Sequence, residues 1–125
     1  MTAKILVADD EPDVLFMTSF SLRSLGGYQV LEAHDGAEAV EIARRERPDL
    51  IVLDVKMPKM TGYEACRQIR QDPDLYATPV ILLTAKGQKT ELDEGRDAGA
   101  SEYMLKPYAP ATLIGRVREL LGSDA

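Results

Sequence analysis

The sequence has no tryptophan, a single cysteine and a single histidine. Because Cys66 has no second cysteine to pair with, an internal disulfide is excluded, which fits a reducing compartment. Cys66 stands at helical spacing from Ile69, so we interpret it as part of the core. With so few histidine and cysteine side chains, the chain is poor in the ligands that zinc prefers.

Long apolar runs are also missing. The longest, which include residues 5–8 and 50–53, fall far short of the about 18 residues that a membrane-spanning helix needs. The first residues carry neither a basic leader nor a long apolar segment followed by a cleavage site. We therefore expect a cytoplasmic protein that does not cross a membrane.

Basic side chains are fewer than acidic ones. Lysine and arginine number 15 against 21 acidic residues, for a net charge of −6. A nucleic-acid backbone would be repelled by this charge, so we expect proteins or small cations as partners and no nucleic acid. The length of 125 residues matches one domain, and 45% hydrophobic with 29% charged residues is typical of globular proteins.

Five apolar segments alternate with segments of helical character from end to end. Residues 5–8, 50–53 and 80–83 are uninterrupted apolar runs, typical of strands buried on both faces of a parallel sheet. Residues 28–33 and 103–105 are weaker candidates for the second and fifth strands. Five βα units without a linker or repeat predict one doubly wound α/β domain.

The helices between these strands carry start and stop signals. Asp35 and Thr61 each precede a glutamate by three residues, which is the spacing of a capping box. Prolines fit first-turn positions and glycines fit helix ends at Pro12, Pro110, Gly26, Gly99 and Gly122.

Two of the expected helices are unusual. Residues 89–97 hold one large apolar side chain, Leu92, and an interior glycine, Gly95, which predicts a segment that shifts at low cost. In the first helix, apolar residues fall on two arcs. The arc expected to pack on the sheet holds Val14, Leu15, Leu22 and Leu25. The other arc, which is either wedged among neighbouring helices or docks a partner protein, holds Phe16, Met17 and Phe20.

Reactive side chains stand where the strands end. Asp9 and Asp10 follow the first strand, Asp54 ends the third, Thr84 the fourth and Lys106 the fifth. In a parallel sheet all these ends lie at one edge, where ligands bind. Three clustered carboxylates repel one another unless a cation intervenes. Hard oxygen donors predict Mg²⁺, or Mn²⁺, rather than zinc.

This set of groups suits phosphoryl transfer. Asp54 is the predicted nucleophile, which attacks phosphorus and forms an acyl phosphate. The cation and Lys106 would offset the charge of the transferring group, and the Thr84 hydroxyl would hydrogen-bond a phosphoryl oxygen. Each residue alone has an ordinary explanation as a cap, a turn former or a surface charge. The coincidence at four strand ends is what favours a site.

Four motifs follow one another along the chain. They are KILVADDEP at residues 4–12, DLIVLD at 49–54 with Met57-Pro58 and Gly62, PVILLTA at 79–85, and Gly99-Ala100 leading to Lys106-Pro107. Together they resemble the receiver domain of response regulators in two-component signalling, of the stand-alone chemotaxis-like type. The resemblance implies a flavodoxin-like fold, with five parallel strands in the order 2-1-3-4-5 and helices on both faces. Residues 1–122 would form the receiver and 123–125 a short tail.

The resemblance implies that Asp54 accepts a phosphoryl group from a phosphohistidine of a sensor histidine kinase or a histidine phosphotransfer protein. Asp10 and Asp54 would bind magnesium directly, and Asp9 would bind the metal or orient a bound water. The backbone carbonyl of Lys56 would be a further ligand.

Other residues acquire roles through the same resemblance. Thr84, Lys106 and the backbone of Ala85 would hold the phosphoryl group. Tyr103 would turn inward together with Thr84 on activation, unless it is a static core aromatic. The Lys106-Pro107 bond would be cis, which is otherwise the minority state.

Two lysines and a docking surface are particular expectations for this chain. Lys56 and Lys86 occupy positions that tune hydrolysis of the phosphoryl group, and neither is an acid or amide that would position water. We therefore expect a long-lived phosphorylated form, unless both are simply surface lysines. Partner docking is expected at Val14, Met17, Pro107 and Tyr108.

Output would pass to a protein target through the fourth helix, fifth strand and fifth helix, from a monomer or a weak, phosphorylation-dependent dimer. The protein would be a regulator that catalyses only its own phosphorylation and dephosphorylation, and not an enzyme. One alternative is a Mg²⁺-dependent phosphatase with an aspartyl nucleophile. Others are a receiver cut from a larger DNA-binding or enzyme-output regulator, and a degenerate receiver kept only for binding.

Overall fold

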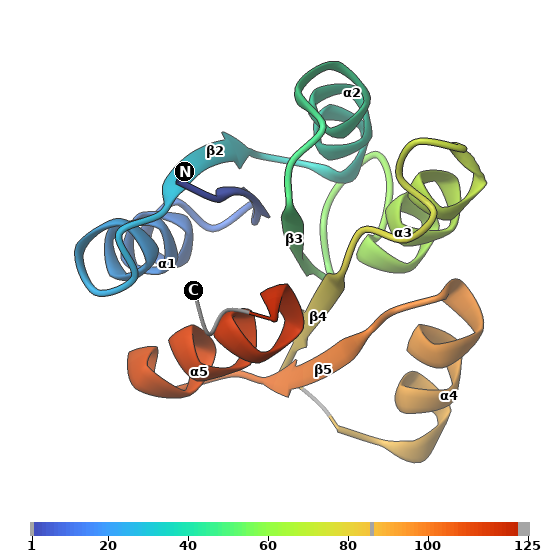
Figure 1. The fold of residues 1–125 in the computed structure, drawn as a ribbon. Helices are drawn as coiled ribbons and strands as arrows, with labels where there is room; N and C mark the ends of the chain where they lie inside the picture. Colours follow the sequence, from blue (N-terminus) through green and yellow to red (C-terminus); the bar gives the residue numbers. More distant parts are fainter. Residues whose placement is uncertain (1, 86, 123–125) are drawn as a thin grey trace.

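The computed structural model, which describes residues 2–85 and 87–122, contains one parallel sheet (Figure 1). Its strands are β1 (Lys4–Ala8), β2 (Gln29–Ala33), β3 (Leu50–Asp54), β4 (Val80–Thr84) and β5 (Glu102–Leu105). They lie in the order β2-β1-β3-β4-β5, as the family resemblance implied. The two weak strand candidates, β2 and β5, are the two edges of the sheet.

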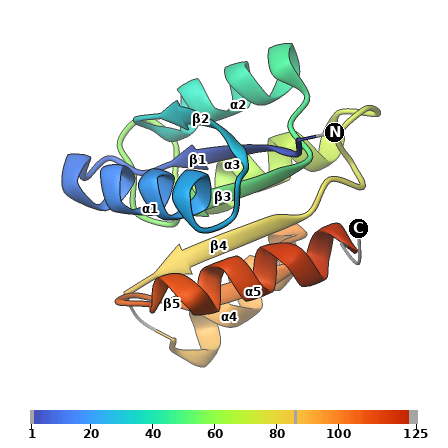
Figure 2. The same ribbon diagram turned by 60° about the vertical axis from the view of Figure 1, so that its left-hand side comes forward.

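Five helices cover the sheet. They are α1 (Pro12–Ser24), α2 (Gly36–Glu46), α3 (Gly62–Gln71), α4 (Lys89–Ala98) and α5 (Pro110–Leu121). Helices α1 and α5 lie on one face, and α2, α3 and α4 lie on the other (Figure 1). Figure 2 shows the helices running lengthwise along the strands. No helix in the described part of the chain is long and apolar enough to cross a membrane.

The central strands are apolar on both sides because both sides are covered. Ile5 and Val7 of β1 join the core beneath α1 and α5, whereas Leu6 and Ala8 join the core beneath α2 and α3. All four are fully buried. Cys66 is buried in the second of these cores, and burial raises the pKa of its thiol, which keeps it protonated.

Helix ends match the sequence signals with two exceptions. The Thr61–Glu64 capping box is complete. At α2, the Asp35 side chain accepts from the Glu38 backbone, but the Glu38 carboxylate bonds the backbone N–H of His34 instead of that of Asp35. The prediction that Gly26 ends α1 is inaccurate, because α1 ends at Ser24. The left-handed residue in this turn is Gly27, with φ of 70°.

The two arcs of α1 separate largely as expected. Leu15 and Leu22 are buried against the sheet. Leu25 was expected beside them but is 58% exposed, although it is the C-cap of α1, has a right-handed helical backbone and donates its N–H to the carbonyl of Ser21. On the other arc, Phe16 and Phe20 stack with ring centroids 6.0 Å apart and face outward.

Gly95 in the middle of α4 has a packing role that the sequence did not reveal. An added Cβ would lie 2.4 Å from Cε2 of Tyr103, so only glycine lets the tyrosine ring lie against the helix. The low helix propensity of this residue is therefore the consequence of a close contact between α4 and β5.

Arg70 on α3 joins the turns that precede β4 and β5. Its Nε donates to the carbonyl of Gly99 at 2.8 Å, and Nη1 donates to the carbonyl of Thr78 at 2.5 Å. Further acceptors are the carbonyls of Leu75 and Tyr76 and the hydroxyl of Ser101. One guanidinium thus donates to several backbone carbonyls in these two turns.

We expect Arg70→Ala to lower the free energy of unfolding by about 2–3 kcal/mol, because charged hydrogen bonds to several carbonyls are lost together. Urea denaturation measures the change. The control is Arg67→Ala on the same helix, which removes a single exposed pair with Glu94 at 2.7 Å and should matter much less. Equal losses in the two variants would contradict this role of Arg70.

Candidate functional site

Three polar side chains are buried at the carboxyl edge of the sheet. Asp9 directly follows β1, Asp54 ends β3 and Thr84 ends β4, and their exposed fractions are 1%, 5% and 4%. The parallel register brings these ends together, since Ala8 lies opposite Leu53 and Asp54 lies opposite Leu83. Two buried carboxylates this close need a counter-charge.

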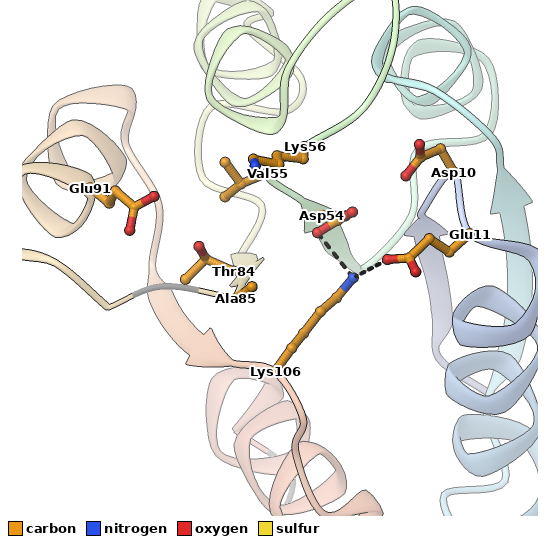
Figure 3. A pocket seen from close by; sticks show the side chains of 9 residues that line it. All are labelled: Asp10, Glu11, Asp54, Val55, Lys56, Thr84, Ala85, Glu91 and Lys106. Carbon is orange, nitrogen blue, oxygen red and sulfur yellow. Dashed lines mark hydrogen bonds and ion pairs between the residues drawn. The ribbon is translucent and has the colours of Figure 1, made fainter.

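Lys106, which follows β5, supplies that counter-charge (Figure 3). Its Nζ lies 3.0 Å from Oδ2 of Asp9, 3.2 Å from Oδ1 of Asp54 and 3.5 Å from Oε1 of Glu11. The side chain is only 15% exposed. Its backbone N–H donates to the carbonyl of Thr84 at 2.7 Å, which fixes where the side chain begins.

The loop after Asp54 folds tightly over the strand end. The backbone N–H of Gly62 donates to the carbonyl of Val55 at 2.9 Å. A Cβ on Gly62 would lie 2.3 Å from the backbone oxygen of Asp54, so this close approach requires glycine. Gly62 of the second motif therefore shapes the backbone beside the predicted nucleophile.

Burial and like charge set the protonation of Asp54. Burial and the neighbouring Asp9 carboxylate raise the pKa of Asp54 from its ordinary 3.8 to about 6, and Lys106 offsets part of that rise. Burial alone would lower the pKa of Lys106, but its hydrogen bond to Asp9 and the charge of Asp54 raise it. The ammonium thus stays charged among the carboxylates.

The donor set fits a hard divalent cation. Oxygens of Asp9, Asp10, Glu11 and Asp54 lie within 4.8 Å of one another. Carboxylate oxygens without nitrogen or sulfur are the ligands that Mg²⁺ prefers. Glu11 joins this cluster although the sequence interpretation did not include it. Its position directly after two aspartates was the available signal.

A cavity of ≈ 260 Å³ opens over Asp54. Among the predicted site residues, Asp10, Lys56, Thr84, Ala85 and Lys106 line it (Figure 3). Lys86, the second lysine expected to tune hydrolysis, lies outside the described residues. Glu91 of α4, which the sequence interpretation missed, faces the same cavity from the side opposite Asp10 and Glu11.

Tyr103 lies away from this cavity, on β5 beneath α4. Its hydroxyl is 2.7 Å from that of Tyr63 and donates to the carbonyl of Glu91 at 2.8 Å. Burial and the hydrogen bond with Tyr63 raise the pKa of Tyr103, so it is protonated at neutral pH. No pattern in the sequence indicated that Tyr63 would meet it.

The predicted docking residues gather beside the site. Val14, Met17, Pro107 and Tyr108 line a second cavity of ≈ 550 Å³ between α1 and the loop after β5. The Tyr108 hydroxyl is hydrogen-bonded to that of Thr18, which joins the loop to α1. The Lys106-Pro107 bond is cis, as the resemblance implied.

Comparison with known proteins identifies the family. The model of the response regulator receiver domain matches residues 5–118. The chain belongs to this family. A receiver domain takes part in two-component signalling as the phosphoacceptor, which agrees with the site at the end of β3.

Relatives of known sequence are regulators. The receiver is 42% identical over 121 residues to the alkaline phosphatase synthesis transcriptional regulatory protein PhoP of Bacillus subtilis, and 46% identical over 121 residues to the response regulator MprA of Mycobacterium ulcerans. Each alignment covers 97% of this chain, but 49% and 51% of the two relatives. The chain thus spans about half the length of the curated relatives it matches.

Solved structures agree over nearly the whole chain. The chemotaxis protein CheY4 of Vibrio cholerae superposes with a TM-score of 0.91 at 35% identity, covering 96% of this chain and 99% of that one. The receiver domain of a sensor histidine kinase from Pseudomonas aeruginosa gives 0.91 at 34% identity, covering 98% and 100%. That structure has a magnesium ion coordinated in its active-site cleft. These neighbours confirm the flavodoxin-like fold.

Asp54→Asn should stabilise the metal-free protein at neutral pH. The pKa of Asp54 is raised from 3.8 to about 6. Between these two pH values the folded state binds more protons than the unfolded state, so the protein loses stability as pH rises through this range. The gain from asparagine should be absent below about pH 4 and reach about 1–3 kcal/mol above about pH 7. Thermal unfolding in EDTA measures it. A gain independent of pH would show that burial of this charge is not its cause.

Proposed function

We propose that Asp54 is the phosphoacceptor of this receiver and takes its phosphoryl group from a phosphohistidine of a sensor histidine kinase or a histidine phosphotransfer protein. The observation that carries the proposal is the position of Asp54. Its carboxylate is buried at the end of β3, within 3.2 Å of Lys106 and within 4.8 Å of oxygens of three other acids. An isolated structural aspartate would not need such surroundings.

The transfer requires an ionised Asp54. A carboxylate oxygen forms a bond to phosphorus while the bond from phosphorus to the imidazole nitrogen breaks, and the nitrogen keeps the electron pair. Magnesium held by Asp9, Asp10 and Asp54, with the Lys56 carbonyl as a further ligand, would supply positive charge at the transferring oxygens. The same charge favours the ionised form of Asp54.

The remaining groups hold the product. Lys106 already lies beside Asp54, so a short movement of its ammonium places it on a phosphoryl oxygen. Thr84 and Ala85 line the same cavity, and the hydroxyl of Thr84 and the backbone N–H of Ala85 would donate to the other oxygens. Each group binds charge that is absent before transfer, so each favours the phosphorylated state.

The signal would leave through the face formed by α4, β5 and α5. Tyr103 on β5 contacts α4, and Thr84 borders the same strand, because Thr84 lies opposite Leu105. A protein target that binds this face would sense the positions of Thr84 and Tyr103. The kinase or phosphotransfer protein would dock on the cavity beside Val14 and Met17. In solution the receiver would be a monomer or a weak dimer that phosphorylation strengthens.

Acetyl phosphate with Mg²⁺ should add the mass of one phosphoryl group, in a linkage labile to base. The adduct should be absent in Asp54→Asn and after addition of EDTA, because both remove part of the site. Intact-protein mass spectrometry measures it. The control is Asp49→Asn, just before β3 at the opposite edge of the sheet, where the side chain accepts from the backbone of Lys4.

The control variant should be phosphorylated like the unaltered protein. An Asp54→Asn protein that still gains the adduct would refute Asp54 as the acceptor. Steady release of phosphate from small phosphate esters, without an adduct, would instead favour the aspartyl phosphatase.

We further propose that Lys56 prolongs the phosphorylated state. Lys56 is exposed at the cavity rim, where an ammonium offers no acceptor to orient an attacking water. Lys56→Asn, which supplies an amide oxygen, should shorten the lifetime of the acyl phosphate several-fold, as followed by its decay after donor removal. The control is Lys59→Asn in the same loop. Lys59 pairs with Asp35 outside the cavity, and asparagine tolerates its φ of 68°. Equal lifetimes for Lys56→Asn and the unaltered protein would remove this role.

A further inference from the structure

Two tyrosines from different elements share one acceptor beneath α4. The hydroxyls of Tyr63 on α3 and Tyr103 on β5 are 2.7 Å apart. Both also reach the backbone carbonyl of Glu91, at 3.2 Å from Tyr63 and 2.8 Å from Tyr103. The three oxygens thus form a closed set of contacts that joins α3, α4 and β5.

The ring of Tyr103 fills a space beside α4 that exists because residue 95 is glycine. Gly95 leaves the space that the ring occupies, with Cε2 of Tyr103 at 2.4 Å from where a Cβ would stand. Leu82 of β4 also borders that space. Tyr103 packs against the core formed beneath α2 and α3, and so does Tyr63. The ring of Tyr103 is therefore positioned by packing against Gly95 and Leu82 and by the hydrogen bond between its hydroxyl and that of Tyr63.

Both partners of Tyr103 are connected to the phosphoacceptor site. Tyr63 directly follows Gly62, whose backbone packs on the carbonyl of Asp54. Glu91 offers its carbonyl to the tyrosines while its side chain lines the cavity over Asp54 (Figure 3). A change in how Tyr103 is held would therefore move groups that border the site.

We propose that Tyr63 is a positioning residue, which holds Tyr103 inward against α4 before any phosphoryl group is present. The proposal rests on the proposed phosphoacceptor function and deepens it. The inward conformation of Tyr103 is then already populated in the unphosphorylated protein, so phosphorylation requires less reorganisation of α4. Loss of the Tyr63 hydroxyl should release Tyr103 toward solvent and let the start of α4 move.

The variant Tyr63→Phe tests this directly, since it removes one oxygen and keeps the ring in the core. Loss of one hydrogen bond should reduce the inward population about fivefold relative to the outward one. We would label the protein with 3-fluorotyrosine and assign the Tyr103 resonance by its loss in Tyr103→Phe. Line broadening by a soluble gadolinium chelate then reports how exposed Tyr103 is.

The expected result is at least twofold stronger broadening of the Tyr103 resonance in Tyr63→Phe. The matched control is Tyr76→Phe, which alters a tyrosine that is 67% exposed and should leave this resonance unchanged. Gly95→Ala, whose Cβ occupies the place of the ring, should displace Tyr103 independently and supplies the reference for the outward position. Unchanged broadening in Tyr63→Phe would overturn the proposal.

A second readout separates positioning from general stabilisation. When Tyr103 is present, Tyr63→Phe should slow phosphorylation by acetyl phosphate about fivefold. In a Tyr103→Phe background the same substitution should slow it much less, because the effect passes through Tyr103. Equal slowing in both backgrounds would show that Tyr63 acts by another route and would overturn the proposal. The fluorine measurement uses unphosphorylated protein, so it decides the position of Tyr103 even if Asp54 accepts no phosphoryl group.

Discussion

The contact of Lys106 with the buried carboxylates is the interaction on which this molecule depends. Asp9 and Asp54 lie almost without solvent at adjacent strand ends, and burial together with the repulsion from Asp9 raises the pKa of Asp54 to about 6. One ammonium at 3.0 and 3.2 Å from them makes the arrangement tolerable. The chain thus keeps a site that destabilises it in part, because a cation and a phosphoryl group can bind there.

The parallel sheet explains how this cluster can be both distant in sequence and close in space. Each central strand is buried on both faces, so its first free position for a polar group is its carboxyl end. β5 has a double role at this edge. It brings Lys106 to the carboxylates and, three residues earlier, brings Tyr103 to α4. Occupancy of the site and the surface beneath α4 are therefore linked through one short strand.

Local patterns in the sequence predicted the five strands and the helices between them, and the family resemblance supplied the strand order. Continuous apolar runs revealed β1, β3 and β4, and the residues that end them revealed the site. Errors arose where burial or packing depends on another element. Leu25 continues the helical period as the C-cap of α1 but is exposed, so periodicity predicted the direction of the side chain and not whether a neighbour covers it. Gly95 was interpreted only as lowering the stability of its helix, because the tyrosine ring that it accommodates comes from another element, β5. Such contacts between elements carry no periodic signal.

At this site the negative charge of the chain is concentrated where ligands would bind. Four acids lie together at this site and Lys106 pairs with three of them, so negative charge exceeds positive charge before any ligand binds. A cation reduces that excess, and a phosphoryl group restores part of it in a new place, above Asp54 instead of between Asp54 and Asp9. With the proposed phosphorylation of Asp54, Lys106 and Thr84 would follow the charge outward. The repulsion that costs stability in the resting protein would then be the force that transmits the addition of phosphate along β4 and β5.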